Sequence, residues 1–232
     1  MRISNEELQI ISDHRSTQQP AKSLMQAAVA IILREGENGT EFLLMQRAKH
    51  EQDPWSGQMS FPGGKIDPED DSALAAAIRE TEEEVGIILT EDDYIGQLDD
   101  LYGLKVDNQF SVHVACFVFK PIRELIPIGN HEVADLVWLP FNFLDKTENS
   151  VDYYHPSNLK IKMPAIMINK NKEQILWGLS LRMISTFYDL LGWQLRALSE
   201  FDMTELKQFE KRNLDSSKLD AITKQLFLRE TK

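Results

Sequence analysis

The spacing of hydrophobic and polar positions predicts a mixed domain of strands and helices. Residues 25–34 (MQAAVAIILR) and 41–47 (EFLLMQR) are short apolar runs that predict two strands. The sequence GENG at 36–39 lies between them and has the residues of a tight hairpin turn. We therefore expect these two strands to form a hairpin near the start of the main domain.

The other apolar segments predict the remaining elements. A short helix is expected over 4–14, with Ser4 or Asn5 as its cap, and helical spacing over 178–197 predicts a closing helix. Residues 141–145 predict a helical turn. Further strands are expected at 94–104, 110–119, 133–139, 160–168 and 173–177.

These elements divide the chain into three parts. We expect an N-terminal helical extension at 1–20, a main domain at 21–198 and a C-terminal helical appendage at 199–232. The 232 residues, 42% of them hydrophobic, suffice for one domain with such additions. Surface packing is the simplest role for the appendage, and a dimer contact is the alternative.

The charge balance disfavours nucleic-acid binding. Lys and Arg number 25 against 37 Asp and Glu, which gives a net charge of −12. A chain this acidic repels polyanions unless a basic patch or bound cations intervene, and the longest basic cluster is KNK at 170–172. A small phosphorylated ligand remains compatible with this charge, because metal ions can bridge two anionic groups.

Cysteine usage and targeting patterns bear on the cellular location. Cys116, the one cysteine, lies in the apolar run VACFVF and is expected to be a buried thiol. A single cysteine forms no internal disulfide, which favours a reducing cytosol or organelle matrix. No run approaches the roughly 18 apolar residues of a membrane span, and the N-terminus lacks a secretory pattern. A cytoplasmic protein without membrane contact is expected.

A long loop and an acidic helix carry the candidate chemistry. Residues 48–71 contain several glycines and prolines, and such a stretch inside a compact domain usually serves function. A helix is expected at 72–86, with Ser72 as its N-cap and Gly86 as its end. Its core-facing stripe is expected to comprise Leu74, Ile78, Thr81 and Val85. Small side chains are expected to keep the acidic side low for a ligand: Ala73, Ala76 and Ala77.

Glu80, Glu83 and Glu84 form a like-charged cluster on adjacent turns of this helix. Such charges repel one another, and a bound divalent cation is the simplest compensation. Oxygen ligands favour Mg²⁺ or Mn²⁺ over zinc. A solvated acidic face is the alternative interpretation. The preceding Gly63 and Gly64 favour the site, because glycine lets backbone amides and carbonyls approach a metal or phosphate.

The segment FPGGKIDPEDDSALAAAIRETEEEVGI, residues 61–87, resembles the Nudix box, G-x5-E-x7-R-E-U-x-E-E-x-G-U, where U is a bulky apolar residue. The matching positions are Gly64, Arg79, Glu80, Glu83, Glu84, Gly86 and Ile87. Thr81 departs from the pattern, because an aliphatic residue is usual there. The acid of the first half is Asp71, one residue late, or Asp70, which restores the first spacing and breaks the second.

The flanking sequence resembles the coenzyme A pyrophosphatase branch of this superfamily over roughly residues 25–195. The resemblance also includes the strand-to-helix junction ILWGLSLRMI at 175–184. Its other matching positions are Leu43, Leu44, Arg47, Gly57, Phe61, Pro62, Gly63 and Gly64. That branch usually has a second arginine between Arg47 and Gly57, where this chain has His50, Glu51, Gln52 and Asp53.

The resemblance implies an α/β/α sandwich with a mixed sheet and a loop-helix-loop box. It implies that Glu80, Glu83, Glu84 and the Gly64 carbonyl bind Mg²⁺ or Mn²⁺ and activate a water molecule. Arg79 is then expected to position the carboxylates by a bidentate bond; a contact with a substrate phosphate is the alternative. The substrate would be a small nucleotide, and homodimers are common among relatives.

The expected site is completed by Glu132, Arg47 and Gly63. Glu132, in a loop before a strand, is expected to act as metal ligand or general base; an exposed loop acid is the alternative. Glu83 is the other candidate for the base. Arg47 is expected to contact a substrate phosphate, with a surface salt bridge as the alternative, and Gly63 and Gly64 approach the substrate through their backbone.

Three functions remain open from the sequence. The first is hydrolysis of coenzyme A or acyl-coenzyme A to 3′,5′-ADP and a 4′-phosphopantetheine product. The second is the same chemistry on ADP-ribose, NADH or another nucleotide, which the missing second arginine keeps open. The third is a non-catalytic nucleotide-binding module, and the presence of Glu80, Glu83 and Glu84 argues against it.

Overall fold

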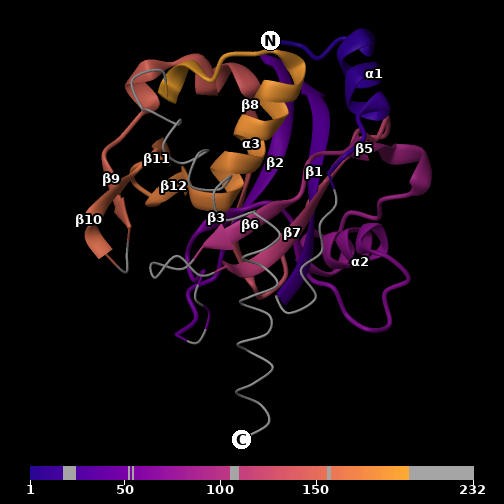
Figure 1. Cartoon of the computed structure of the whole chain (residues 1–232), viewed down its shortest axis with the longest axis horizontal. Helices are drawn as coiled ribbons and strands as arrows, with labels where there is room; N and C mark the ends of the chain where they lie inside the picture. The colour runs from indigo at the N-terminus through magenta and orange to yellow at the C-terminus, as the bar shows by residue number, and fades with distance from the viewer. Residues whose placement is uncertain (18–24, 52, 54, 105–109, 156–157, 199–232) are drawn as a thin grey trace, which may run out of the picture.

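The computed structural model describes residues 1–17, 25–51, 53, 55–104, 110–155 and 158–198 (Figure 1). The C-terminal helical appendage expected at 199–232 lies outside the described residues, as do residues 18–20 of the expected N-terminal extension. Within the described ranges, no helix is long and apolar enough to span a bilayer.

A mixed β-sheet occupies the centre of the fold (Figure 1). Strand β1 (Met25–Gly36) pairs antiparallel with the strand that follows it and parallel with β7 (Phe110–Phe119). Eight strands belong to this sheet in the described part of the chain: β1 (Met25–Gly36), β2 (Gly39–Arg47), β3 (Met59–Ser60), β4 (Gly63–Lys65), β5 (Tyr94–Gln97), β6 (Leu101–Leu104), β7 (Phe110–Phe119) and β8 (Val133–Pro140). The expected α/β class is confirmed.

Helices cover the two faces of the sheet: α2 (Ala73–Val85) on one and α3 (Gly178–Leu191) on the other. Successive side chains of a strand point to opposite faces of the sheet, so the apolar side chains of β1 contribute to a core on each face. Ile31 and Leu33 join the core beneath α3, whereas Ala28 and Ala30 join the core beneath α2. The arrangement is the expected sandwich of helix, sheet and helix.

Helix α2 packs closely on β1 because small side chains meet at the contact. Ala76 and Ala77 are fully buried against the alanine face of β1. The expectation that these alanines lie on the open acidic side was therefore wrong. Their small size brings the helix near the sheet, so that its acidic residues lie beside the strand β4 that flanks β1.

Helix α1 (Asn5–Asp13) belongs to the same packed body. Ser4 begins it with a capping box, in which the Ser4 hydroxyl accepts from the Glu7 amide and the Glu7 carboxylate accepts from the Ser4 amide. Ile11 is buried against β5, where a Cβ on Gly96 would lie 2.4 Å from the Ile11 carbonyl oxygen. A residue from the far end of the described chain also contacts α1, because the Trp193 indole donates to Glu7 at 2.8 Å.

Three predicted elements have different bounds in the structure. The strand expected at 94–104 is two strands, β5 and β6, separated by a short loop. The strand expected at 160–168 is also two, because Pro164 has no amide to continue the ladder. The closing helix ends at Leu191 instead of 197, because Gly192 adopts a left-handed conformation with φ 69°.

The remaining elements lie outside the central sheet. Two further pairs form small antiparallel hairpins: β9 (Tyr153–His155) with β10 (Asn158–Met163), and β11 (Ala165–Asn169) with β12 (Gln174–Trp177). Short 3₁₀ turns complete the described structure: η1 (Glu91–Asp93), η2 (Phe141–Asp145), η3 (Thr147–Asn149) and η4 (Arg196–Leu198). Cys116 is a fully buried free thiol on β7, as expected, and burial raises its pKa.

Candidate active site

Helix α2 begins and ends where its sequence predicts. The Ser72 hydroxyl accepts a hydrogen bond from the Ala75 amide at 3.1 Å, which caps the first turn. Gly86 ends the helix in a left-handed conformation with φ 67°. Both signals are local, so the register of the acidic residues on this helix follows directly from the sequence.

Strand β4 brings two glycines against the acidic side of α2. Gly63 has φ 143°, and a Cβ there would lie 2.3 Å from the Ala28 carbonyl oxygen, so a side chain is excluded. A Cβ on Gly64 would lie 2.5 Å from the Glu80 carboxyl carbon. The backbone of β4 therefore contacts the carboxylates directly.

Glu84 is the buried carboxylate of the site, with a side chain that is 5% exposed. The Gly63 amide donates to its Oε2 at 2.8 Å. Burial raises the pKa of Glu84 to about 8; the Gly63 amide and the nearby Arg47 charge oppose this rise, and the charges of Glu80 and Glu132 add to it. Burial thus disfavours the ionised form of Glu84, and a cation beside the carboxyl group would favour that form.

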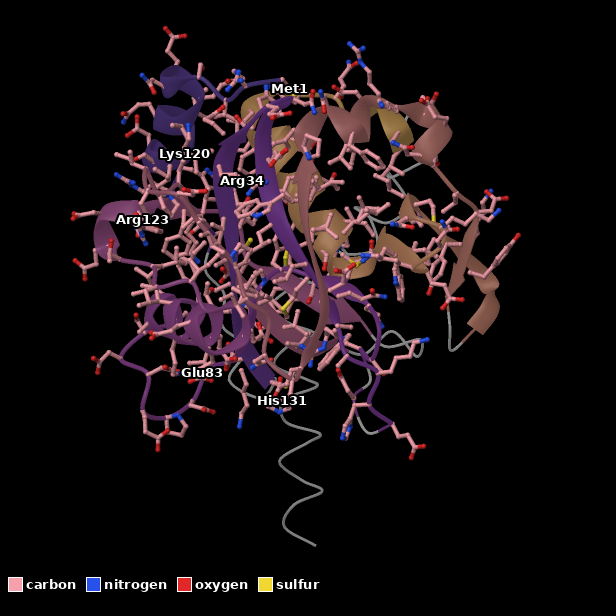
Figure 2. The ribbon with its side chains drawn as sticks, turned by 180° about the vertical axis from the view of Figure 1, so that it is seen from behind. Met1, Arg34, Glu83, Lys120, Arg123 and His131 are labelled. Atoms are coloured by element: carbon pink, nitrogen blue, oxygen red, sulfur yellow. The ribbon has the colours of Figure 1, made fainter. Side chains whose placement is uncertain are left out.

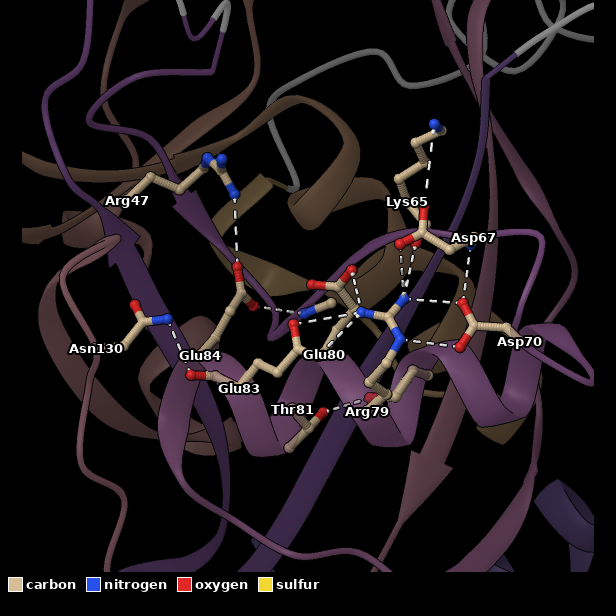
Figure 3. A network of polar contacts seen from close by, with 12 residues as sticks. Arg47, Lys65, Asp67, Asp70, Arg79, Glu80, Thr81, Glu83, Glu84 and Asn130 are labelled. Carbon is tan, nitrogen blue, oxygen red and sulfur yellow. Dashed lines mark hydrogen bonds and ion pairs between the residues drawn. The ribbon is translucent and has the colours of Figure 1, made fainter.

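Arg79 lies among the acidic residues and bonds to several of them (Figure 3). Its Nε and Nη2 donate to the two Asp70 oxygens at 2.9 and 2.8 Å, a bidentate pair. Its Nη1 donates to Glu80 at 3.0 Å and to Glu83 at 3.3 Å. Arg79, in the middle of α2, thus holds the helix to the loop before it and orients two further carboxylates. The Glu80 pKa is raised, mainly by burial, although Arg79 opposes that rise.

Asp70 settles which acid of the first half of the box meets the arginine. Its side chain is 6% exposed, and the Arg79 hydrogen bonds lower its pKa to about 2. Asp71 is exposed. The spacing from Gly64 to the acid is therefore the usual one, and the additional residue lies between Asp70 and Arg79, in the turn that leads into α2.

The unusual Thr81 is accommodated by a local hydrogen bond. Its side chain is fully buried, and its hydroxyl donates to the Ala77 carbonyl one turn earlier at 2.7 Å. This bond satisfies the polar atom within the helix itself. Thr81 and Val85 are buried on the core side, and Leu74 and Ile78 pack against the same core, as the stripe predicts.

Arg47 reaches the site from the end of β2. Its Nε donates to Asp53 at 2.8 Å, and its Nη1 lies 3.8 Å from Glu84 Oε1. Asp53 also accepts from the Trp55 amide at 2.9 Å, so it shapes the loop after β2. Arg47 is therefore in a partly buried salt bridge that borders the acidic cluster.

The loop before β8 carries Glu132 to the same end of α2. Glu132 is about half exposed, at 54%, and its charge acts on Glu84. His131 points outward beside it, at the same edge of the molecule as Glu83 (Figure 2). Asn130 joins this loop to α2, because its side-chain amide donates to the Glu83 carbonyl at 2.9 Å. Sequence reasoning missed Asn130, although asparagine in a loop often bonds to nearby backbone.

The carboxylates suit a hard divalent cation, but they are engaged with protein donors. Among the described residues, no three metal-ligating side chains form a ready-made cluster. Arg79 holds Glu80 and Glu83, and the Gly63 amide holds Glu84. The side-chain atoms that could coordinate a metal ion here are carboxylate oxygens, which suits Mg²⁺ or Mn²⁺. A cation would exchange some of these bonds for its own and offset the buried charge of Glu84.

Comparison with known protein families decides the assignment. The family model for the NUDIX domain matches residues 24–157, more than half of the chain. This chain belongs to the Nudix hydrolase family. The match contains β4, α2 and the Glu132 loop, so the acidic site lies within the Nudix domain. The expected membership in this family is confirmed.

Individual Nudix relatives agree with this assignment. A probable nudix hydrolase of Schizosaccharomyces pombe is 28% identical over 167 residues, which is 72% of this chain and 55% of that protein. The chain thus spans about half the length of this relative. The Nudix hydrolase NudL of Yersinia pestis is 32% identical over 150 residues, 61% of this chain and 68% of that protein.

Solved structures show the same fold. A MutT/nudix family protein from Enterococcus faecalis has a TM-score of 0.52 and 17% sequence identity, over 92% of this chain and 83% of that one. At this identity the likeness concerns the architecture alone. It agrees with the mixed sheet between helices described above.

Proposed function

We propose that this Nudix domain hydrolyses the pyrophosphate bond of a nucleoside-diphosphate-linked small molecule with the help of Mg²⁺ or Mn²⁺. The observation that carries the proposal is the contact between β4 and α2. There Gly63 bonds to the buried Glu84, and Gly64 lies directly against Glu80. A purely structural helix has no need to keep two carboxylates under a glycine strand, one of them with its pKa raised to about 8.

Four groups would hold the ions: the Glu80, Glu83 and Glu84 carboxylates and the Gly64 carbonyl. Bound divalent ions neutralise the pyrophosphate and lower the pKa of water. Glu83 is the most exposed of the three glutamates, at 56%, and is open to ligand on the solvent side. Glu84 is the least exposed of the three, at 5%. The site therefore extends from the solvent-exposed Glu83 to the buried Glu84.

The chain's own residues have separate tasks in this proposal. Arg79 orients Glu80 and Glu83 through its Nη1. Glu132 or Glu83 accepts the proton of the attacking water; Glu83 is in the last turn of α2 and Glu132 is in the loop before β8. Arg47 contacts a substrate phosphate, which requires exchange of its bond to Asp53. The Gly63 amide keeps Glu84 in place during these events.

Coenzyme A or acyl-coenzyme A is the substrate that the flanking sequence supports best. Cleavage would yield 3′,5′-ADP and a 4′-phosphopantetheine product. One observation favours a different nucleotide: Asp53 neutralises Arg47 in the loop where the coenzyme A branch usually has a second arginine. ADP-ribose, NADH and related dinucleotides, which lack the 3′-phosphate of coenzyme A, are therefore the second candidate.

A product assay over a nucleotide panel tests the proposal. The panel contains coenzyme A, acetyl-coenzyme A, dephospho-coenzyme A, ADP-ribose, NADH and diadenosine polyphosphates, each with Mg²⁺ or Mn²⁺ and with an EDTA control. Coenzyme A and its dephospho form differ only in the 3′-phosphate. Their ratio of kcat/KM therefore measures what that group contributes.

The outcomes separate the levels of the proposal. Metal-dependent release of 3′,5′-ADP, with the highest kcat/KM for a coenzyme A species, supports both reaction and substrate. Preference for a substrate without a 3′-phosphate supports the reaction and rejects the coenzyme A assignment. No metal-dependent turnover of any member rejects the hydrolase, and nucleotide binding without turnover would support a binding module.

A further inference from the structure

We propose that Asn130 is a positioning residue that holds Glu132 against the acidic end of α2. The inference rests on the proposed hydrolase function, because Asn130 is assigned its role through Glu132, an acid of the proposed site. Asn130 lies two residues before Glu132 in the loop that leads into β8. Its amide side chain uses donor and acceptor in opposite directions, and the two bonds join separate parts of the site.

The first direction is toward the helix. Asn130 Nδ2 donates to the Glu83 carbonyl at 2.9 Å (Figure 3). The Asn130 backbone amide donates to the Glu84 carbonyl at 2.9 Å. The last carbonyls of a helix have no partners within it. Asn130 therefore bonds to the backbone of the two glutamates that lie nearest the end of α2.

The second direction is toward the acid in the loop. The Glu132 backbone amide donates to Asn130 Oδ1 at 2.8 Å, which closes a tight turn. The Glu132 carbonyl in turn accepts from the Ala48 amide at 2.7 Å, one residue after Arg47. The Asn130 side chain thus bonds to both the helix and the loop. The backbone of Glu132 then bonds to the segment that directly follows the strand carrying Arg47.

The side-chain bonds are specific to the position of Glu132 and are not needed for the fold of the loop end. The Ile128 amide donates to the Val85 carbonyl at 2.8 Å, so the loop has a further attachment to α2. This bond and that of the Asn130 backbone amide remain when the side chain is removed. What is lost is the coupling of Glu83 to Glu132, whose charge already acts on Glu84.

The test is a double-mutant cycle with Asn130→Ala, Glu132→Gln and the double variant. One readout is kcat/KM for the best substrate of the panel, and the other is Mn²⁺ affinity by calorimetry without nucleotide. Loss of a group that orients a metal-site residue typically costs about 10–100-fold. We expect Asn130→Ala to lose about that much in each readout that Glu132→Gln lowers. We expect the double variant to match Glu132→Gln alone.

Two variants guard against trivial effects. Asn130→Asp retains the acceptor for the Glu132 amide but replaces the donor to Glu83, and we expect it to lose activity as Asn130→Ala does. Asn149→Ala removes a matched bond, from Asn149 Nδ2 to the Phe143 carbonyl at 2.8 Å, between η2 and η3, and we expect wild-type values. Thermal unfolding of each variant confirms that it is folded.

The inference is overturned if Asn130→Ala or Asn130→Asp matches wild type, or if Glu132→Gln changes neither readout. Multiplicative losses in the double variant would also overturn it, because Asn130 would then act independently of Glu132. A wild-type protein without metal-dependent turnover overturns the proposed function instead. In that case the Mn²⁺ cycle still decides the role of Asn130.

Discussion

The amide of Gly63 and the carboxylate of Glu84 are 2.8 Å apart, although 21 residues separate them in the sequence. The bond crosses from β4 to the last turn of α2, and it joins the residue just before the Nudix box to the acidic half of the box. Gly63 lies so close to β1 that a side chain there is excluded. The position of the deepest carboxylate therefore depends on a backbone group that only glycine can place.

Replacing Gly63 by alanine should destabilise the protein strongly. The new Cβ would meet the Ala28 carbonyl and the Val29 Cα, at 2.3 and 2.5 Å, in a backbone with φ 143°. We expect the free energy of unfolding in urea to fall by about 2–4 kcal/mol. Gly192→Ala is the control, because φ is 69° there but nothing lies within 4 Å; it should cost about 1–2 kcal/mol. Equal losses in the two variants would contradict the close approach described here.

Replacing Glu83 by glutamine should abolish turnover without unfolding the protein. The substitution keeps the size of an exposed side chain and removes its charge, so metal binding and proton transfer suffer while packing does not. We expect kcat to fall by about 1,000-fold or more, since the residue serves the reaction directly. Glu82→Gln, on the exposed side of the same turn, should leave kcat unchanged. Near-normal turnover by the Glu83 variant would reject the proposed metal site.

Asp70 and Asp71 should differ sharply despite their adjacency. Asp70→Asn removes one charge from the bidentate pair with Arg79, whose Nη1 orients Glu80 and Glu83. We expect kcat/KM to fall by about 10–100-fold, while Asp71→Asn at the exposed neighbour stays at wild-type activity. Steady-state assays of the two variants measure this, and the reverse order would place the acid of the box at Asp71.

The stability of the metal-free protein should fall as the pH rises, because of Glu84. Its folded-state pKa is raised from 4.5 to about 8, so folding favours the protonated form. This contribution is fully present below about pH 4.5 and is lost as the pH rises through about 8. Between about pH 5.5 and pH 8.5, in EDTA, wild type should lose about 3 kcal/mol more than Glu84→Gln.

Urea unfolding at the two pH values measures this difference, with Glu82→Gln as the control that keeps the wild-type slope. Added Mn²⁺ should restore the stability of wild type at the higher pH, since a ligand that binds only the folded state stabilises it. Equal pH dependence in wild type and Glu84→Gln would show that Glu84 ionises in the folded protein as it does in the unfolded chain.

Local signals in the sequence predicted α2 and its glutamates well. Ser72 and Gly86 determine the ends of the helix, so the spacing of Glu80, Glu83 and Glu84 translates directly into positions on its surface. The hairpin turn between β1 and β2 was equally readable, because its residues act on the backbone next to them. These features depend on neighbours within a few residues.

Other features depend on tertiary distances that spacing does not contain. The acid that meets Arg79 was ambiguous between Asp70 and Asp71, because the turn before α2 decides which side chain points back. Ala76 and Ala77 are buried because β1 presents alanines beneath them. Asn130 lies at the site because its loop contacts α2, although Asn130 is 47 residues after its partner Glu83 in the sequence.

The link between Glu7 and Trp193 bears on how the protein is made. Their side chains bond at 2.8 Å across a separation of 186 residues. During synthesis from the N-terminus, this end of α1 emerges early and lacks its partner near α3 until almost the whole domain has left the ribosome. Contacts of such high sequence separation slow folding, so the nascent chain keeps part of the α1 surface uncovered until synthesis of the domain is nearly complete.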